Sequence, residues 1–164
     1  MKILHSILVT SLLIIAFPTQ AALRCGALVV DATPVVLPVH VNGGMRQREL
    51  DEVGSRIKVR AIVLDDDTTT LTIVVVDSCM MSRAFLDGAK AAASKKTGIR
   101  TDRMFISATH THSAPASMGC LGTNVDPRYP LLLKRKIVEA IDGAKKNLEP
   151  AQVGAAVFDA KEFT

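Results

Sequence analysis

The chain has 164 residues, of which 48% are hydrophobic and 22% charged, and its net charge is +4. This length supports one domain with a hydrophobic core, and this hydrophobic content excludes an intrinsically disordered chain. Lysine and arginine form no block with interleaved aromatic residues, and the chain has one tyrosine. The composition therefore gives no support to nucleic-acid binding.

The N-terminus has the pattern of a secretory signal peptide. Lys2 precedes an apolar stretch at residues 7–17, and small residues follow up to Ala21. The stretch is shorter than the roughly 20 apolar residues of a transmembrane helix. We expect residues 1–21 to be removed on export to the periplasm or the cell exterior. The alternatives are a buried N-terminal helix and a lipoprotein-type cleavage that leaves Cys25 lipidated.

Hydrophobic patterning predicts the elements that follow. Residues 57–64 and 71–76 are close enough to pair as a hairpin, and the second of these strands is apolar enough for burial on both faces. Ser82 is the expected cap of the first helix, which Gly98 ends. In chain order, we expect strands at residues 28–30, 57–64, 71–76, 104–109 and 152–158, helices at 83–96 and 131–147, and long loops at 31–48 and 113–130.

The strand-helix-strand order over residues 71–109 predicts a parallel crossover. Asp77 and His110 would then follow the carboxyl ends of neighbouring parallel strands, where α/β sheets bind ligands. The predicted fold class is α/β, with a mixed, largely parallel sheet and flanking helices. Because the chain stops six residues after the last expected strand, we expect the domain to be incomplete at its C-terminus.

Two histidines in the sequence Thr-His-Thr-His-Ser-Ala-Pro, at residues 109–115, mark the candidate site. Imidazole is a common ligand of Zn²⁺, which lowers the pKa of a bound water to about 7 and polarises a carbonyl group. His110 and His112 could both bind a metal, or one could bind it while the other contacts substrate. They could also be ordinary surface histidines of a loop.

Further candidates have weaker support. Asp77 could be a third ligand, a partner that orients a histidine, or a cap for the helix at Ser82, and the structural role is favoured. His40 is interpreted as a solvated loop residue rather than a ligand. Gly43 and Gly44 serve backbone geometry first, and a backbone N–H there could also face a substrate oxygen.

The chain has three cysteines, an odd number for an exported protein. They permit one disulfide and one free thiol, and none of them forms a Cys-x-x-Cys metal motif. They are Cys25, Cys79 and Cys120.

Over roughly residues 28–158, the chain resembles the N-terminal catalytic domain of the neutral/alkaline (non-lysosomal) ceramidases. The Thr-His-Thr-His-Ser-Ala-Pro sequence is close to that family's Thr-His-Thr-His-Ser-Gly-Pro signature. Three other segments are similar to family segments in order and spacing: residues 29–34 with the Asn-Gly-Gly sequence at 42–44, residues 59–64, and residues 74–80.

The resemblance implies a zinc amidase that splits ceramide, or a related N-acyl lipid, into a long-chain base and a fatty acid. It implies that His110 binds Zn²⁺, that His112 contacts the substrate and reaction intermediate, and that Gly43 lies near the scissile group, with Gly44 as the one-residue alternative. A lipid substrate also implies a peripheral contact with membranes.

The chain departs from the family pattern in three ways. Ala114 stands where the family has glycine, and the early loop lacks the family's Met-Gly-Tyr. The family's remaining zinc ligands (a histidine, a glutamate and a tyrosine) lie further downstream, beyond Thr164. We therefore expect residues 22–164 to be the N-terminal part of such an enzyme, with little activity alone. The alternative is a secreted, non-catalytic domain with an incomplete metal site that binds lipid or another ligand.

Overall fold

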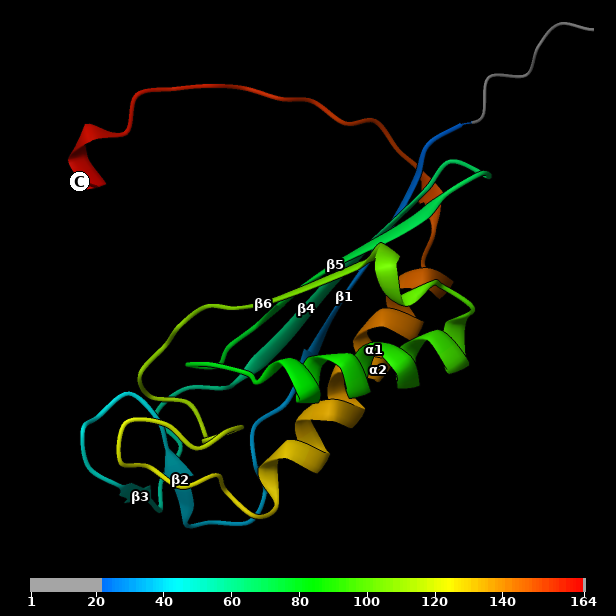
Figure 1. The fold of residues 1–164 in the computed structure, drawn as a ribbon. Coiled ribbons are helices and arrows are strands. Elements are labelled where there is room, and N and C mark those ends of the chain that lie inside the picture. Colours follow the sequence, from blue (N-terminus) through cyan, green and yellow to red (C-terminus); the bar gives the residue numbers. More distant parts are fainter. Residues whose placement is uncertain (1–21, 164) are drawn as a thin grey trace, which may run out of the picture.

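The computed structural model describes residues 22–163, so the expected signal peptide lies outside the described part. Two helices cover one face of a five-stranded sheet, and a small two-stranded sheet lies beyond one end of it (Figure 1). The strands are β1 (Arg24–Asp31), β2 (Val39–Val41), β3 (Arg48–Leu50), β4 (Lys58–Asp65), β5 (Thr70–Val76), β6 (Met104–Ala108) and β7 (Glu149–Pro150). The α-helices are α1 (Arg83–Thr97) and α2 (Tyr129–Lys146), and 3₁₀ turns lie at Thr101–Arg103 and Lys161–Phe163.

The main sheet has the strand order β6-β5-β4-β1-β7, and β2 pairs with β3 in the small sheet. The expected mixed sheet with flanking helices is confirmed. Only β5 and β6 run parallel, however, and the other neighbours are antiparallel, so the expectation of a largely parallel sheet is wrong. For β4 and β5 the reason is their short connection, since a tight turn can join only antiparallel strands.

Local sequence accounts for the central hairpin. The carboxylate of Asp66 accepts hydrogen bonds from the backbone N–H groups of Thr68 and Thr69, at 3.0 and 2.7 Å, and so closes the turn. Val59 faces Val76 across the resulting ladder. The predicted pairing of these two strands is confirmed.

The crossover from β5 to β6 also forms as predicted. The hydroxyl of Ser82 accepts a hydrogen bond from the backbone N–H of Phe85 at 3.2 Å, which caps the start of α1. Gly98 has a φ of 77°, a left-handed conformation that ends the helix. The chain returns in β6, parallel to β5, so both strands deliver their following residues to the same sheet edge.

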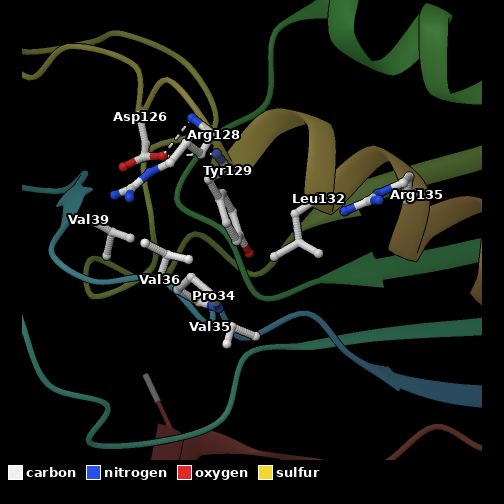
Figure 2. Close-up of a pocket in the computed structure, with 9 residues that line it drawn as sticks. All are labelled: Pro34, Val35, Val36, Val39, Asp126, Arg128, Tyr129, Leu132 and Arg135. Atoms are coloured by element: carbon white, nitrogen blue, oxygen red, sulfur yellow. Dashed lines mark hydrogen bonds between the residues drawn. The ribbon is translucent and has the colours of Figure 1, made fainter.

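The second helix begins at a buried carboxylate. Asp126 is 1% exposed and accepts N–H groups from His40, Arg128 and Tyr129, at 3.2, 2.9 and 2.9 Å. Figure 2 shows the start of α2 beside this carboxylate, with the tyrosine ring directed down between the 34–36 segment and Leu132. These residues line a cavity of about 240 Å³. One carboxylate thus ties the β2 segment to the start of α2.

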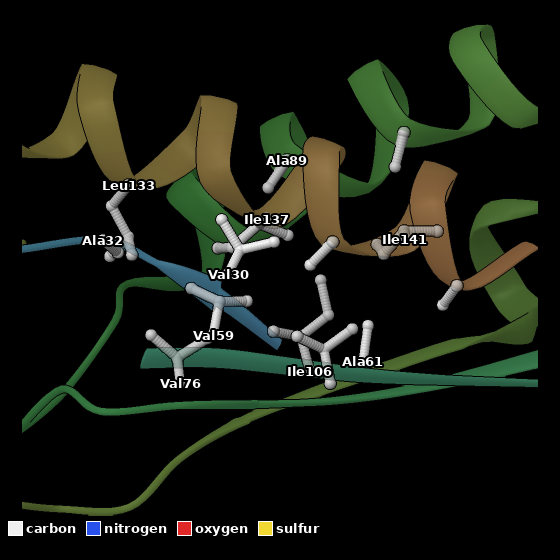
Figure 3. Close-up of a cluster of buried hydrophobic side chains, with 14 of the residues drawn as sticks. Val30, Ala32, Val59, Ala61, Val76, Ala89, Ile106, Leu133, Ile137 and Ile141 are labelled. Atoms are coloured by element: carbon white, nitrogen blue, oxygen red, sulfur yellow. The ribbon is translucent and has the colours of Figure 1, made fainter. Parts of the chain in front are cut away.

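The core lies between the sheet and the helices (Figure 3). Alternate strand residues such as Val30, Val59 and Val76 point toward Leu133 and Ile137 of α2, and all five are at most 6% exposed. Burial of side chains of this size stabilises the fold by about 1.5–3 kcal/mol each. The core therefore fixes the sheet edge that carries the candidate site.

The opposite face of the sheet carries exposed apolar side chains. Ile62, Ile73 and Phe105 form a cross-strand row and are 43%, 43% and 64% exposed. The expectation that residues 71–76 are buried on both faces is therefore wrong. Within residues 22–163, α1 and α2 both cover the same face, so that alternate residues of β5 remain open to solvent.

The strand expected at residues 152–158 is absent from the structure. Only Glu149 and Pro150 pair with β1, and the chain then runs away from the sheet. Val157 and Phe158 are 101% and 79% exposed, so the apolar residues that favoured a strand find no neighbour in the described part. No helix within residues 22–163 combines the length and apolar character needed to span a membrane.

Candidate functional site

The histidine loop meets the early loop through backbone contacts. Val41 at the end of β2 forms an antiparallel bridge with Pro115. The backbone N–H of Asn42 donates to the carbonyl of Ala114 at 3.3 Å, and that of Ala116 donates to the carbonyl of His40 at 2.7 Å. Two segments more than 70 residues apart in the chain are thereby held in register, and this pairing brings Gly43 against His112.

The two histidines follow β6 and lie at the predicted edge of the sheet. The backbone N–H of Thr109 donates to the carbonyl of Val76 at 2.9 Å, which continues the parallel ladder beyond β6. His110 has a φ of 62°, an uncommon left-handed conformation that turns the chain. Its ring meets that of His112 edge to face, with centroids 4.9 Å apart. The expected edge location is confirmed, and both side chains are exposed.

Cys79 completes a group of three candidate metal ligands. Its sulfur lies 4.0 Å from Nδ1 of His110, and one donor atom from each of Cys79, His110 and His112 lies within 4.8 Å of the others. No other such group of three occurs in the part of the chain that the structure describes. Sulfur and imidazole nitrogen are typical ligands of zinc, so the donor set fits that ion chemically.

The backbone around Cys79 orients one of the histidines. Nδ1 of His110 lies 2.8 Å from the carbonyl oxygen of Cys79, an acceptor, so this nitrogen carries the proton and donates. In the neutral imidazole this leaves Nε2 as the nitrogen that can bind a metal, the usual arrangement for a ligand whose other ring N–H is held by a carbonyl group. Burial raises the pKa of the Cys79 thiol, and the nearby Cys120 thiol raises it further.

Gly43 is required by a close approach to His112. Its φ is 103°, and a Cβ atom built there would lie 2.3 Å from Cβ of His112. At Gly44, the nearest atom would be 3.4 Å away, an ordinary contact. The side chain of Arg48 also donates to the backbone carbonyl of His112 at 2.9 Å. Gly43, rather than Gly44, therefore touches the histidine loop, while a contact with substrate remains a prediction.

Asp77 follows β5 at the same end of the sheet, but its contacts are with β4 rather than with the histidines. Its carboxylate accepts the backbone N–H of Lys58 at 2.9 Å and the guanidinium of Arg60 at 2.8 Å. These contacts fasten the start of β4 to the end of β5, while the helix cap is Ser82. The expected role of Asp77 as a helix cap is therefore wrong; its contacts are structural but join two strands, and Asp77 is not in the ligand group.

His40 lies outside the ligand group and belongs to β2. Its ring nitrogens contact the carbonyl of Val125 at 3.2 Å and the carboxylate of Glu49 at 3.1 Å. The interpretation of His40 as a residue other than a metal ligand agrees with these contacts, although its ring is hydrogen-bonded rather than simply solvated.

All three cysteines are free thiols, so the disulfide that their number permits is not formed. Cys120 accepts a hydrogen bond from the side-chain amide of Asn42 at 3.4 Å. Ala114 is fully buried, and its carbonyl accepts the backbone N–H of Asn42.

A cavity with both polar and apolar walls adjoins the histidine loop. Its volume is about 310 Å³, close to the lower end of the roughly 300–1,000 Å³ typical of ligand pockets. Ser113 and Pro115 of the histidine loop form part of its wall, and Val39, Val41 and Leu50 of the small sheet form another part. The histidine loop thus contributes to the cavity through Ser113 and Pro115, while His110 and His112 do not line it.

No family model matches the sequence. Among solved structures, the chain is similar to the neutral ceramidase from Pseudomonas aeruginosa, with a TM-score of 0.69 and 21% identity over 79% of this chain. A structure described as ceramidase complexed with C2 matches equally well. The chain spans 22% of the length of each of these proteins. The fold of residues 22–163 is therefore ceramidase-like.

Proposed function

We propose that the chain is part of a zinc-dependent amide hydrolase that cleaves the N-acyl bond of ceramide or a related lipid. The observation that carries this proposal is the convergence of His110, His112 and Gly43 at one sheet edge of a ceramidase-like fold. His110 is the proposed zinc ligand, and His112 is the proposed contact of the substrate and the intermediate. The chain spans 22% of the length of the similar enzymes, and the resemblance of its motifs places it in the N-terminal portion of such an enzyme.

The chain's own groups support such a reaction at defined positions. Bound zinc would supply Lewis acidity toward the amide carbonyl and a water of lowered pKa. The carbonyl of Cys79 holds Nδ1–H of His110, which leaves Nε2 to bind the ion. The exposed ring of His112 could donate a hydrogen bond to oxygen that becomes negative during the attack. The adjoining 310 Å³ cavity would receive part of the acyl chain.

The proposal includes export and a lipid environment. An N-terminal signal peptide that ends at Ala21 would deliver the protein to the periplasm or the cell exterior. A substrate with long alkyl chains would bring the protein into peripheral contact with membranes. N-terminal sequencing of exported protein should start at residue 22. Intact Met1 would contradict export by cleavage, and a lipid-modified Cys25 would favour the anchored form.

The functional test measures zinc content and the release of fatty acid from a labelled N-acyl lipid. The 164-residue chain alone should be weakly active or inactive, because the resemblance places further ligands outside it. In a longer protein that carries this chain, His110→Ala should abolish zinc binding and turnover. His112→Ala should keep zinc and lower turnover by about 100- to 1,000-fold, the usual cost of losing one oxyanion donor.

His40→Ala is the matched control, because His40 lies in the neighbouring small sheet and outside the ligand group. It should change neither zinc content nor turnover. Full zinc occupancy and normal turnover in the His110→Ala enzyme would refute the assignment. Zinc binding without hydrolysis of any N-acyl lipid would favour a secreted, non-catalytic lipid-binding domain.

A further inference from the structure

We propose that Cys79 binds the metal as a thiolate, which gives the site a sulfur ligand from this chain beside His110. The inference uses the metal of the proposed function and adds a ligand to it. It does not depend on the identity of the substrate or on the role of His112 during hydrolysis.

Distance supports a shared ion. Zinc binds sulfur at about 2.3 Å and nitrogen at about 2.0–2.1 Å, so that two such ligands of a tetrahedral ion lie roughly 3.6 Å apart. One donor atom from each of Cys79, His110 and His112 lies within 4.8 Å of the others. The gap to a shared ion closes with movements of about 1 Å.

The backbone around the thiol is held in place by two hydroxyl groups. Cys79 is 2% exposed, and its neighbours are fixed on both sides. The hydroxyl of Ser117 donates to the carbonyl of Met80 at 2.6 Å, and the hydroxyl of Ser78 donates to the same carbonyl at 3.2 Å. An ion that arrives at this position meets the fixed sulfur of Cys79 beside the exposed imidazole of His110.

The chemistry of the step is an exchange of a proton for a metal ion. The S–H bond of Cys79 breaks, the proton leaves to solvent, and the sulfur lone pair forms the bond to the metal. No electron is transferred. Because thiolate is a soft ligand, the site should prefer zinc or cobalt to magnesium or calcium, which prefer oxygen ligands.

Cobalt(II) is the probe, because a thiolate bound to cobalt gives an intense near-ultraviolet charge-transfer band that imidazole ligation lacks. The full chain, kept reduced, is titrated with cobalt and then with competing zinc. The wild type should show the band. Cys79→Ser should lose it and bind the metal at least 10- to 100-fold more weakly, since the loss of even an outer contact of a metal ligand has about that effect.

The other two cysteines provide matched controls. Cys25→Ser and Cys120→Ser should keep the band, and the double variant leaves Cys79 as the sole thiol of the chain. A band in the double variant can come only from Cys79, so this measurement does not depend on whether Cys79→Ser folds. Absence of the band in the double variant would overturn the proposal.

The outcomes separate this inference from the proposed function. Cobalt binding that requires His110 but shows no thiolate band would refute the role of Cys79 and leave the hydrolase proposal intact. A thiolate band in this chain, together with a longer enzyme that cleaves no N-acyl lipid, would support the sulfur ligand and count against the hydrolase. Failure of the chain to bind cobalt at all would refute the sulfur ligand as a property of this chain.

Discussion

Replacement of Gly43 by alanine tests how the two loops build the site. The new Cβ would lie 2.3 Å from Cβ of His112, and an ordinary contact needs about 3.4 Å, so the histidine must move by about 1 Å. A shift of this size in an active-site group costs about 100-fold in activity. Alanine at a φ of 103° adds strain of about 1–3 kcal/mol. We therefore expect kcat/KM to fall about 100-fold and the free energy of unfolding to fall by about 1–3 kcal/mol.

Fatty-acid release by the longer enzyme measures the first effect, and urea denaturation measures the second. Gly44→Ala is the matched control, because its Cβ would meet nothing closer than 3.4 Å, and its activity should remain near that of the wild type. Zinc content should stay normal in both variants if His110 alone of the two histidines binds the ion. Equal activities of the two alanine variants would refute the contact between Gly43 and His112 as a determinant of the site.

Three further predictions concern the scaffold. Gly26→Ala should lower the free energy of unfolding by about 1–3 kcal/mol or more, because the Cβ would lie 2.0 Å from a backbone carbonyl of α2. Gly54→Ala is the control, because its Cβ would lie in open space and should leave the free energy of unfolding unchanged. Urea denaturation of both variants measures the difference. Asp77→Asn should lower the free energy of unfolding by about 1–3 kcal/mol, because it weakens the contacts with β4 and Arg60. Cobalt binding should stay unchanged. Loss of the metal in a folded variant would contradict the structural role. Burial alone would raise the pKa of Asp126, but the backbone N–H donors lower it below the unfolded value of 3.8. The stabilising effect of this carboxylate is therefore present above about pH 4 and is lost as the pH falls further. The free energy of unfolding of Asp126→Asn should fall less steeply in acid than that of the wild type.

Much of the scaffold could be predicted because its signals are local. The hairpin of β4 and β5 follows from β-branched runs around an Asp/Thr turn, and α1 follows from Ser82 and Gly98. The edge location of the histidines follows from the parallel crossover. The strand at residues 152–158 could not be excluded in this way, because an apolar segment becomes a strand only where a neighbour offers backbone hydrogen bonds.

The sequence by itself determined the order of the main elements, the two histidines and their place after β6. Tertiary structure decided which face of the sheet the helices cover, because helix patterning gives an apolar stripe but not the sheet face that receives it. It also decided the partners of the site: Cys79 beside His110, and Gly43 against His112. These residues are separated by 31 and 69 positions in the chain, and only the pairing of β5 with β6 and of the two loops brings them together.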